Sequence, residues 1–265
     1  SIYPVHRFSR LELGPILSQR DCITAFLGVL RHPKTVVSEG IPLEISRGMD
    51  IISDKIQHLS AKETRLRKTN GRRPPKGIYE ECIEKEVLEG LCGLFHNSYT
   101  LARRARFSSK SPEEKKVYSF LEKMVLSVTE QTEAKIDFSG RYGGRFTERH
   151  DFHSDEQLVA IAIYLAAFEG AGSGILTRDS DIRRILVNTL SFLSYQNQAR
   201  YKAILDSMKR NEIRIYYMKG LGRADVAENS SNFNPQKREE ISPEKLRLIA
   251  SQIGQVNLSL QPARA

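Results

Sequence analysis

The segment 174–186 (GILTRDSDIRRIL) constrains the fold of this chain more than any other. It starts as a short apolar strand that stops at Thr177, and two aspartates, Asp179 and Asp181, follow before an amphipathic helix. In an open α/β sheet, ligands bind where a strand ends and the next helix begins. Carboxylates at that point can present a hard cation to a phosphate. An Asp there can also simply cap the helix, so other parts of the chain must distinguish the two interpretations.

The pattern around this segment predicts a small parallel sheet. Residues 154–169 form an expected buried helix, because apolar side chains occupy nearly all of its faces. After the 174–177 strand, helices are expected through Leu193 and over 196–210, followed by a strand over 212–218. Short strands separated by helices indicate parallel pairing. The sequence therefore predicts an α/β fold with a small parallel sheet flanked by helices.

The first 60 residues contain a weaker version of the same pattern. A helix is expected over 21–30 with Asp21 at its head, followed by a short β-branched strand at 35–38. A second helix opens around Pro42, where a missing N–H does no harm, and runs to Leu59. Glu44 lies early in that helix. Asp21 and Glu44 thus each lie close to the predicted start of a different helix in this half of the chain.

The middle of the chain is basic. The whole chain has a formal net charge of +9, which favours a polyanionic partner such as nucleic acid. Residues 61–150 are expected to form a largely helical basic insertion, with long helices over 79–107 and 112–134 and a break at 61–78. The side chains expected to contact nucleic acid are Arg67, Lys68, Arg72, Arg73, Arg103, Arg104, Arg141, Arg145 and Arg149.

Cysteine usage and hydropathy suggest a cytoplasmic protein. Three cysteines without CxxC spacing argue for a reducing compartment and against a disulfide framework. No apolar run approaches the length of a membrane span. Residues 219–265 are rich in polar residues and are expected to form a flexible tail with one short helix ending near residue 253.

The acidic residues at these predicted strand ends and helix starts can be considered together. Carboxylates that converge at one edge of a sheet repel one another unless divalent cations lie between them. Oxygen ligands suit Mg²⁺ or Mn²⁺, and the matching chemistry is phosphodiester hydrolysis by a metal-activated water. The alternative is that the acids are separate helix caps and surface groups. The residues in question are Asp21, Glu44, Asp155, Asp179 and Asp181.

Two segments of the second half, 155–162 (DEQLVAIA) and 175–182 (ILTRDSDI), resemble the second half of a PIN-domain nuclease. Residues 35–44 are similar to that family's second strand and its acidic helix residue, and 212–218 resembles its closing strand. The resemblance implies a PIN-like α/β domain made of residues 1–60 and 151–218. The insertion 61–150 and the tail 219–265 would be additions to it.

The same resemblance implies a metal-dependent endoribonuclease that hydrolyses single-stranded or structured RNA with Mg²⁺ or Mn²⁺. Glu44, Asp155 and Asp179 would be metal ligands, Asp181 a further acid, and Thr177 would orient carboxylates by hydrogen bonding. Asp21 would occupy the place of the acid that ends the family's first strand.

The chain departs from the family around that first acid. Residues 16–20 (ILSQR), before Asp21, are not the apolar strand that the family has there. Two other functions therefore stay open: a non-catalytic PIN-like nucleic-acid-binding protein, and a helical interaction protein whose acids are all caps. A homodimer or a protein partner is compatible with each of them.

Overall fold

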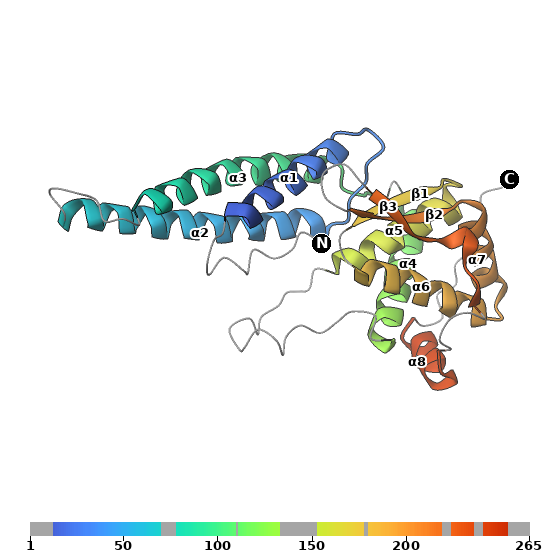
Figure 1. Ribbon diagram of the computed structural model, residues 1–265. Coiled ribbons are helices and arrows are strands. Elements are labelled where there is room, and N and C mark those ends of the chain that lie inside the picture. The colour runs from blue at the N-terminus through green and yellow to red at the C-terminus, as the bar shows by residue number, and fades with distance from the viewer. Residues whose placement is uncertain are drawn as a thin grey trace.

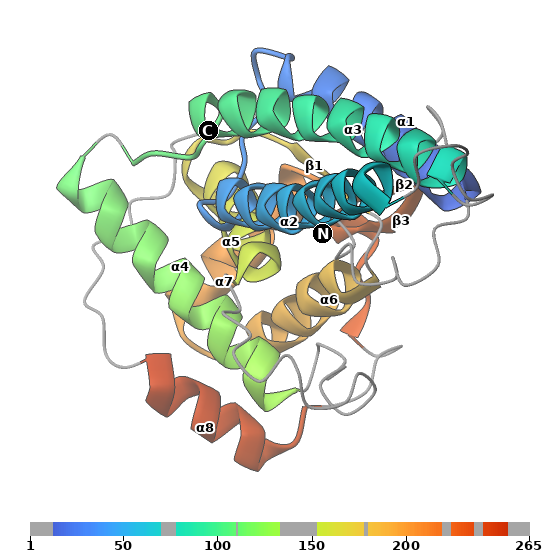
Figure 2. The same ribbon diagram turned by 90° about the vertical axis from the view of Figure 1, so that its left-hand side faces the viewer.

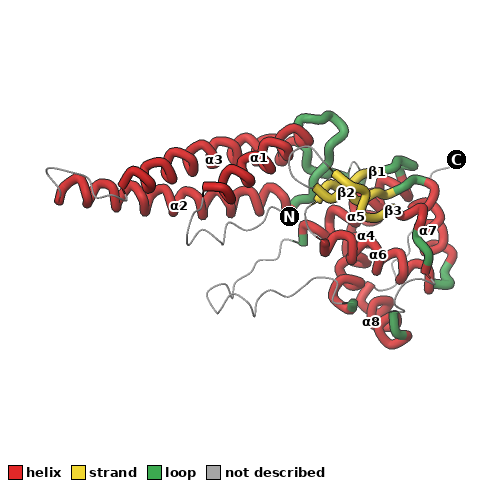
Figure 3. The backbone as a smooth tube through the Cα atoms, in the orientation of Figure 1, coloured by secondary structure: helices red, strands yellow, loops and turns green. Residues whose placement is uncertain are grey.

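The computed structural model describes residues 13–69, 78–109, 111–132, 153–177, 180–218, 224–235 and 241–253. Within these residues the chain is mostly helical, with a small three-stranded mixed sheet (Figures 1 and 3). The helices are α1 (Leu13–Leu30), α2 (Gly40–Thr69), α3 (Ile78–Arg104), α4 (Pro112–Gln131), α5 (Ser154–Phe168), α6 (Ser180–Tyr195), α7 (Ala199–Arg210) and α8 (Pro243–Ile253). The strands are β1 (Ser173–Thr177), β2 (Ile213–Met218) and β3 (Ala224–Asn229), and the 3₁₀ helix η2 spans Ser230–Asn232.

The first three helices form an elongated arm that projects from the rest of the molecule (Figure 1). α2 and α3 pack along each other, and α1 packs on α3. Each helix turns a stripe of apolar residues inward, as an amphipathic helix does when it covers a core. The arm therefore has an apolar core of its own, whose largest fully buried side chains are Ile45, Ile52, Leu88, Leu91 and Phe95.

The other five helices pack together with the sheet in a second, larger core, which we call the body. β1 and β2 are parallel, with Ser173 opposite Ile213 and Thr177 opposite Tyr217. β3 pairs with β2 in the antiparallel sense, so the strand order is β1-β2-β3. The chain passes from β1 to β2 through α6 and α7, the helical crossover that parallel pairing requires. α4 and α8 contact each other along one flank of the body (Figure 2).

Short polar contacts join the arm to the body. Val37, between α1 and α2, exchanges backbone hydrogen bonds with the segment that follows α3: its N–H donates to the Ala105 carbonyl (3.0 Å), and its carbonyl accepts from the Phe107 N–H (2.9 Å). The Gly40 N–H, at the start of α2, donates to Oε1 of Gln157 in α5 (3.1 Å). The Gly40–Gln157 bond thus holds the start of α2 against the first turn of α5, and the Val37 bonds hold the turn before α2 against the segment after α3.

The N-terminal half differs from the predicted pattern. The segment 35–38 is not a strand: of its residues only Val37 forms a β-bridge, with Arg106. α2 passes through the predicted boundary at residue 60 and ends only at Thr69. Residues 61–69 (AKETRLRKT) include several strong helix formers, so their charge does not stop the helix before Asn70-Gly71.

The C-terminal half agrees better with the sequence. The structure confirms the helices expected after residue 78 and the strands at 174–177 and 212–218, with small shifts at their ends. One expectation is wrong: the sheet is mixed and not parallel, because residues 224–229 of the predicted tail form β3. α4, which the sequence prediction assigns to the insertion 61–150, packs on α5, α6 and α8 of the body.

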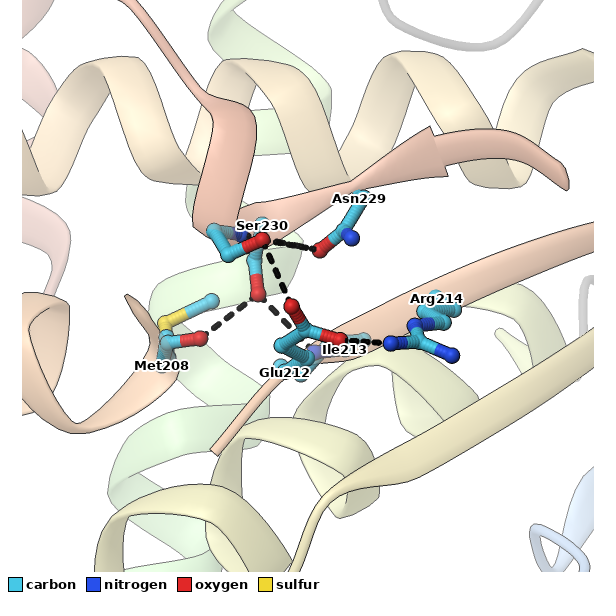
Figure 4. Close-up of polar contacts among 7 residues, drawn as sticks. Met208, Glu212, Ile213, Arg214, Asn229 and Ser230 are labelled. Atoms are coloured by element: carbon cyan, nitrogen blue, oxygen red, sulfur yellow. Dashed lines mark hydrogen bonds and ion pairs between the residues drawn. The ribbon is translucent and has the colours of Figure 1, made fainter. Parts of the chain in front are cut away.

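A buried serine fixes the segment that was expected to be a tail (Figure 4). Ser230 is completely buried, and its hydroxyl donates to the Met208 carbonyl at 2.6 Å and accepts from the Ile213 N–H at 2.9 Å. The end of α7, the start of β2 and η2 therefore meet at one hydroxyl. Beside it, hydrogen bonds from Ser231 and Arg214 lower the pKa of the Glu212 carboxyl below its ordinary value.

Replacing Ser230 with alanine is expected to lower the free energy of unfolding by about 1–3 kcal/mol, because the Ile213 N–H and the Met208 carbonyl stay buried without their partner. Urea denaturation measures this change. Ser251→Ala is the matched control: its hydroxyl bonds only to the Leu248 carbonyl on the exposed side of α8, and we expect a change within about 0.5 kcal/mol. Equal effects in the two variants would contradict the structural role of Ser230.

Candidate carboxylate site at the end of β1

Three carboxylate side chains are buried among the residues that the structure describes, and they lie in two helix starts. Asp155 and Glu156 belong to the first turn of α5, and their residues are 9% and 1% exposed. Asp181, in the first turn of α6, is 6% exposed. A buried carboxylate is costly unless it is paired, hydrogen-bonded or bound to a metal. These two helix starts are therefore where the described structure buries its acidic side chains.

Chain geometry brings the two turns to the same end of the sheet. α5 ends at Phe168, and after a short turn β1 runs back along it, so the two elements are antiparallel and in contact. A 15-residue helix and a five-residue strand are of similar length, about 22 and 17 Å. Thr177, at the carboxyl end of β1, therefore lies near the start of α5, and α6 starts directly afterwards at Ser180.

The electrostatic setting favours acidic groups and anions. The amino-terminal ends of α5 and α6 each carry a partial positive charge from unpaired backbone N–H groups. Arg184 adds a full charge, with its Nη1 3.9 Å from Oδ1 of Asp181, and its side chain is about half exposed. Arg183 lies beside it and pairs with Glu228 of β3 (3.2 Å), which ties the first turn of α6 to the sheet.

The start of α2 forms another wall of this region. Gln157 accepts from the Gly40 N–H and donates through Nε2 to Oε1 of Glu122 in α4 (2.9 Å), so it links three helices. Glu44 is half-buried and lies one helical turn beyond Gly40. Burial, with Glu122 and Glu39 nearby, raises the pKa of the Tyr118 phenol above its ordinary value.

The residues predicted for the site differ in where the structure places them. Thr177 is buried at the end of β1, and Asp155, Asp181 and Glu44 lie on the helices that meet there. Asp179 lies outside the described residues.

Asp21 is not at the head of a helix, as the sequence predicts, but in the middle of α1, because that helix starts at Leu13. α1 packs on α3 in the arm, so the structure does not bring Asp21 to the end of β1. In the described parts of the chain, no three His, Cys, Asp or Glu side chains are close enough together to hold a metal ion.

The predicted nucleic-acid-binding residues are only partly described. Arg103 and Arg104 are exposed at the end of α3. Arg67 and Lys68 belong to the last turn of α2, but their side chains lie outside the description. Outside the described residues altogether are Arg72, Arg73, Arg141, Arg145 and Arg149.

Sequence reasoning missed Glu156 and Gln157. The signal was present, because a helix with apolar residues on nearly every face has no solvent-facing side for the polar residues of its first turn. Both residues follow Asp155 in that turn, so burial of Glu156 could have been expected along with that of Asp155.

The chain matches no family model, no curated protein and no solved structure. Among the described residues, no helix combines the length and the apolar character needed to cross a membrane. Any functional assignment must therefore come from the chemistry of the site itself.

Proposed function

We propose that this chain is a PIN-like, metal-dependent endoribonuclease whose site lies at the carboxyl end of β1. The observation that carries the proposal is the burial of three carboxylates in the first turns of two helices, α5 and α6. A helix cap needs one short side chain near the end of each helix. It does not need Asp155 and Glu156 buried side by side, with Asp181 buried in the neighbouring helix start.

The donor set suits a hard divalent cation. Asp155 and Asp181 offer carboxylate oxygens, which Mg²⁺ and Mn²⁺ prefer. Asp179, two residues before Asp181, would supply the further acid, and Glu44, early in α2, would be a further ligand. A bound cation would activate a water and offset charge on the scissile phosphate.

The other residues of the site would position these groups. Thr177 is buried at the end of β1, and its hydroxyl would hold one of the carboxylates in orientation. Arg184, half exposed beside Asp181, can contact a phosphate oxygen of the substrate. Gln157, held between α2 and α4, fixes the first turn of α5. The cytoplasm, inferred from the cysteine usage, would give the enzyme access to RNA.

Metal dependence is the first test of this function. An RNA oligonucleotide labelled at its 5′ end should be cut internally in Mn²⁺ or Mg²⁺, and cleavage should stop in EDTA and return when excess Mn²⁺ is added. Gel electrophoresis of the products measures it. Cleavage that continues in EDTA would exclude metal-dependent hydrolysis, and a lack of cleavage in both metals would exclude the nuclease.

A non-catalytic nucleic-acid-binding protein is the second candidate. It is favoured by the position of Asp21, which lies in the arm and leaves the site one acid short of the family pattern. This candidate predicts RNA binding that is equal in Mn²⁺ and EDTA, with no cleavage in either. The metal test therefore separates the two functions.

A further inference from the structure

We propose that five exposed basic residues at the base of the arm form the surface that holds single-stranded RNA beside the carboxylate site. This inference deepens the proposed function, because it assigns the surface that binds the substrate. The five residues, which we call the junction patch, come from the end of α1 and the turn after it and from the end of α3 and the segment after it: Arg31, Lys34, Arg103, Arg104 and Arg106.

Backbone hydrogen bonds bring the two segments together. The Thr35 N–H donates to the His32 carbonyl (3.0 Å), which closes the turn that carries Arg31 and Lys34. Two residues later, Val37 bonds to Ala105 and Phe107 on either side of Arg106. The ends of α1 and α3 therefore lie at the same end of the arm, next to the start of α2 (Figures 1 and 2).

The charges of the patch are available to a partner. All five side chains belong to exposed residues, and the Arg106 side chain is 55% exposed. Glu39 lies 4.0 Å from Arg106 but is itself 64% exposed, so it offsets only one of the five charges, and weakly. Arg103 lies over the ring of Tyr99, with its Cζ 5.7 Å from the ring centroid. A guanidinium on an aromatic ring is a common element of surfaces that bind single strands.

The patch leads directly to the carboxylate site. Gly40 is the third residue after Val37, so the two are at most about 11 Å apart along the chain. The Gly40 N–H bonds to Gln157, in the same turn as Asp155 and Glu156. An RNA strand whose phosphates lie on the junction patch would therefore extend only a short distance to enter the carboxylate site.

Beyond the junction, the exposed residues of the arm carry both signs of charge. The exposed acids are Asp50, Asp54, Glu86 and Glu89, and α2 also exposes Lys62 and Arg65. At the junction, by contrast, five exposed basic residues lie close together with Glu39 as a neighbouring carboxylate. The density of positive charge is therefore what favours the junction as the place where phosphates bind.

The test compares two variants that lose the same number of charges. The patch variant carries Arg31→Gln, Lys34→Gln, Arg103→Gln, Arg104→Gln and Arg106→Gln. The control variant replaces five exposed basic residues of α7 and α8 with Gln, in the part of the body far from the arm: Lys202, Lys209, Arg210, Lys245 and Arg247. Binding of a fluorescent 20-nucleotide single-stranded RNA is measured by anisotropy in EDTA, over a range of salt concentrations, with single-stranded DNA of the same sequence in parallel.

The patch variant should bind RNA at least about 100-fold more weakly than the wild type at 0.1 M salt, and the slope of log K against log salt should become shallower by about 3, because each phosphate contact on a single strand contributes about 0.7. The control variant should stay within about threefold of the wild type, because exposed charges beyond a Debye length of about 10 Å are screened. DNA that binds as tightly as RNA would support recognition through phosphates, and binding to DNA alone would overturn the assignment to RNA.

Equal losses of RNA affinity in the two variants would show that binding depends only on the net charge of the protein. That result would overturn the junction patch as the binding surface. The five basic side chains could instead only stabilise the carboxyl ends of helices α1 and α3. The patch variant would then melt at a lower temperature and keep its RNA affinity, and this result would also overturn the inference. Because binding is measured in EDTA, its outcome is independent of cleavage. A chain that binds RNA through the patch but never cuts it would refute the nuclease and leave the patch standing.

Discussion

Replacing Asp155 with asparagine is expected to lower the rate of Mn²⁺-dependent RNA cleavage by about 10²–10³, with RNA binding in EDTA unchanged. Asn keeps the shape of the side chain but removes the charge that would hold a metal and stabilise the transition state. The same change at Asp181 should act in the same direction, because both carboxylates are buried at the end of β1. Single-turnover cleavage at saturating protein measures the effect.

The control for these variants is Asp206→Asn. Asp206 is exposed on α7, so its loss should leave the cleavage rate within about twofold, as for surface positions in general. Full activity in Asp155→Asn and Asp181→Asn would remove the site from the end of β1.

Replacing Phe192 with alanine is expected to lower the free energy of unfolding by about 3–5 kcal/mol. Phe192 is completely buried in α6, and its ring meets the Tyr201 ring of α7 edge-on, with 5.7 Å between centroids. Truncation leaves a cavity in the larger core that places the starts of α5 and α6. Urea denaturation followed by circular dichroism measures it.

Truncation of an exposed apolar residue is the control for Phe192→Ala. Leu248 of α8 is 45% exposed, so Leu248→Ala should cost less than about 1 kcal/mol, because little apolar surface returns to water. If Phe192→Ala cost as little as Leu248→Ala, the packing of α6 on α7 would not carry the stability of the body.

The body was more predictable from the sequence than the arm. α5, β1 and α6 follow from local signals: an apolar run, a short strand and a polar helix start, each within a few residues. β3 has no such signal, since 224–229 (ADVAEN) is not rich in strand-forming residues, and its place depends on pairing with β2. Pairing with β2, and not the local sequence pattern, therefore makes residues 224–229 a strand.

The residues of the candidate site also differ in how well the sequence predicts their positions. Burial of Asp155, Thr177 and Asp181 could be anticipated, because each follows or starts an element whose apolar pattern is strong. The position of Asp21 could not, because nothing in residues 13–20 stops α1 from starting earlier. The junction patch was also only partly predicted: Arg103 and Arg104 were expected to contact nucleic acid, whereas Arg31 and Lys34 join them through the backbone bonds of Val37.

The most direct test of a metal-dependent carboxylate site is to locate the metal. Crystals grown with Mn²⁺ would be measured at a wavelength where manganese scatters anomalously. We predict an anomalous peak at the carboxyl end of β1, about 2.0–2.2 Å from carboxylate oxygens of Asp155 and of Asp179 or Asp181, since these are ordinary distances for small divalent cations and carboxylates. A peak confined to another part of the molecule, or none at saturating Mn²⁺, would contradict the proposed site.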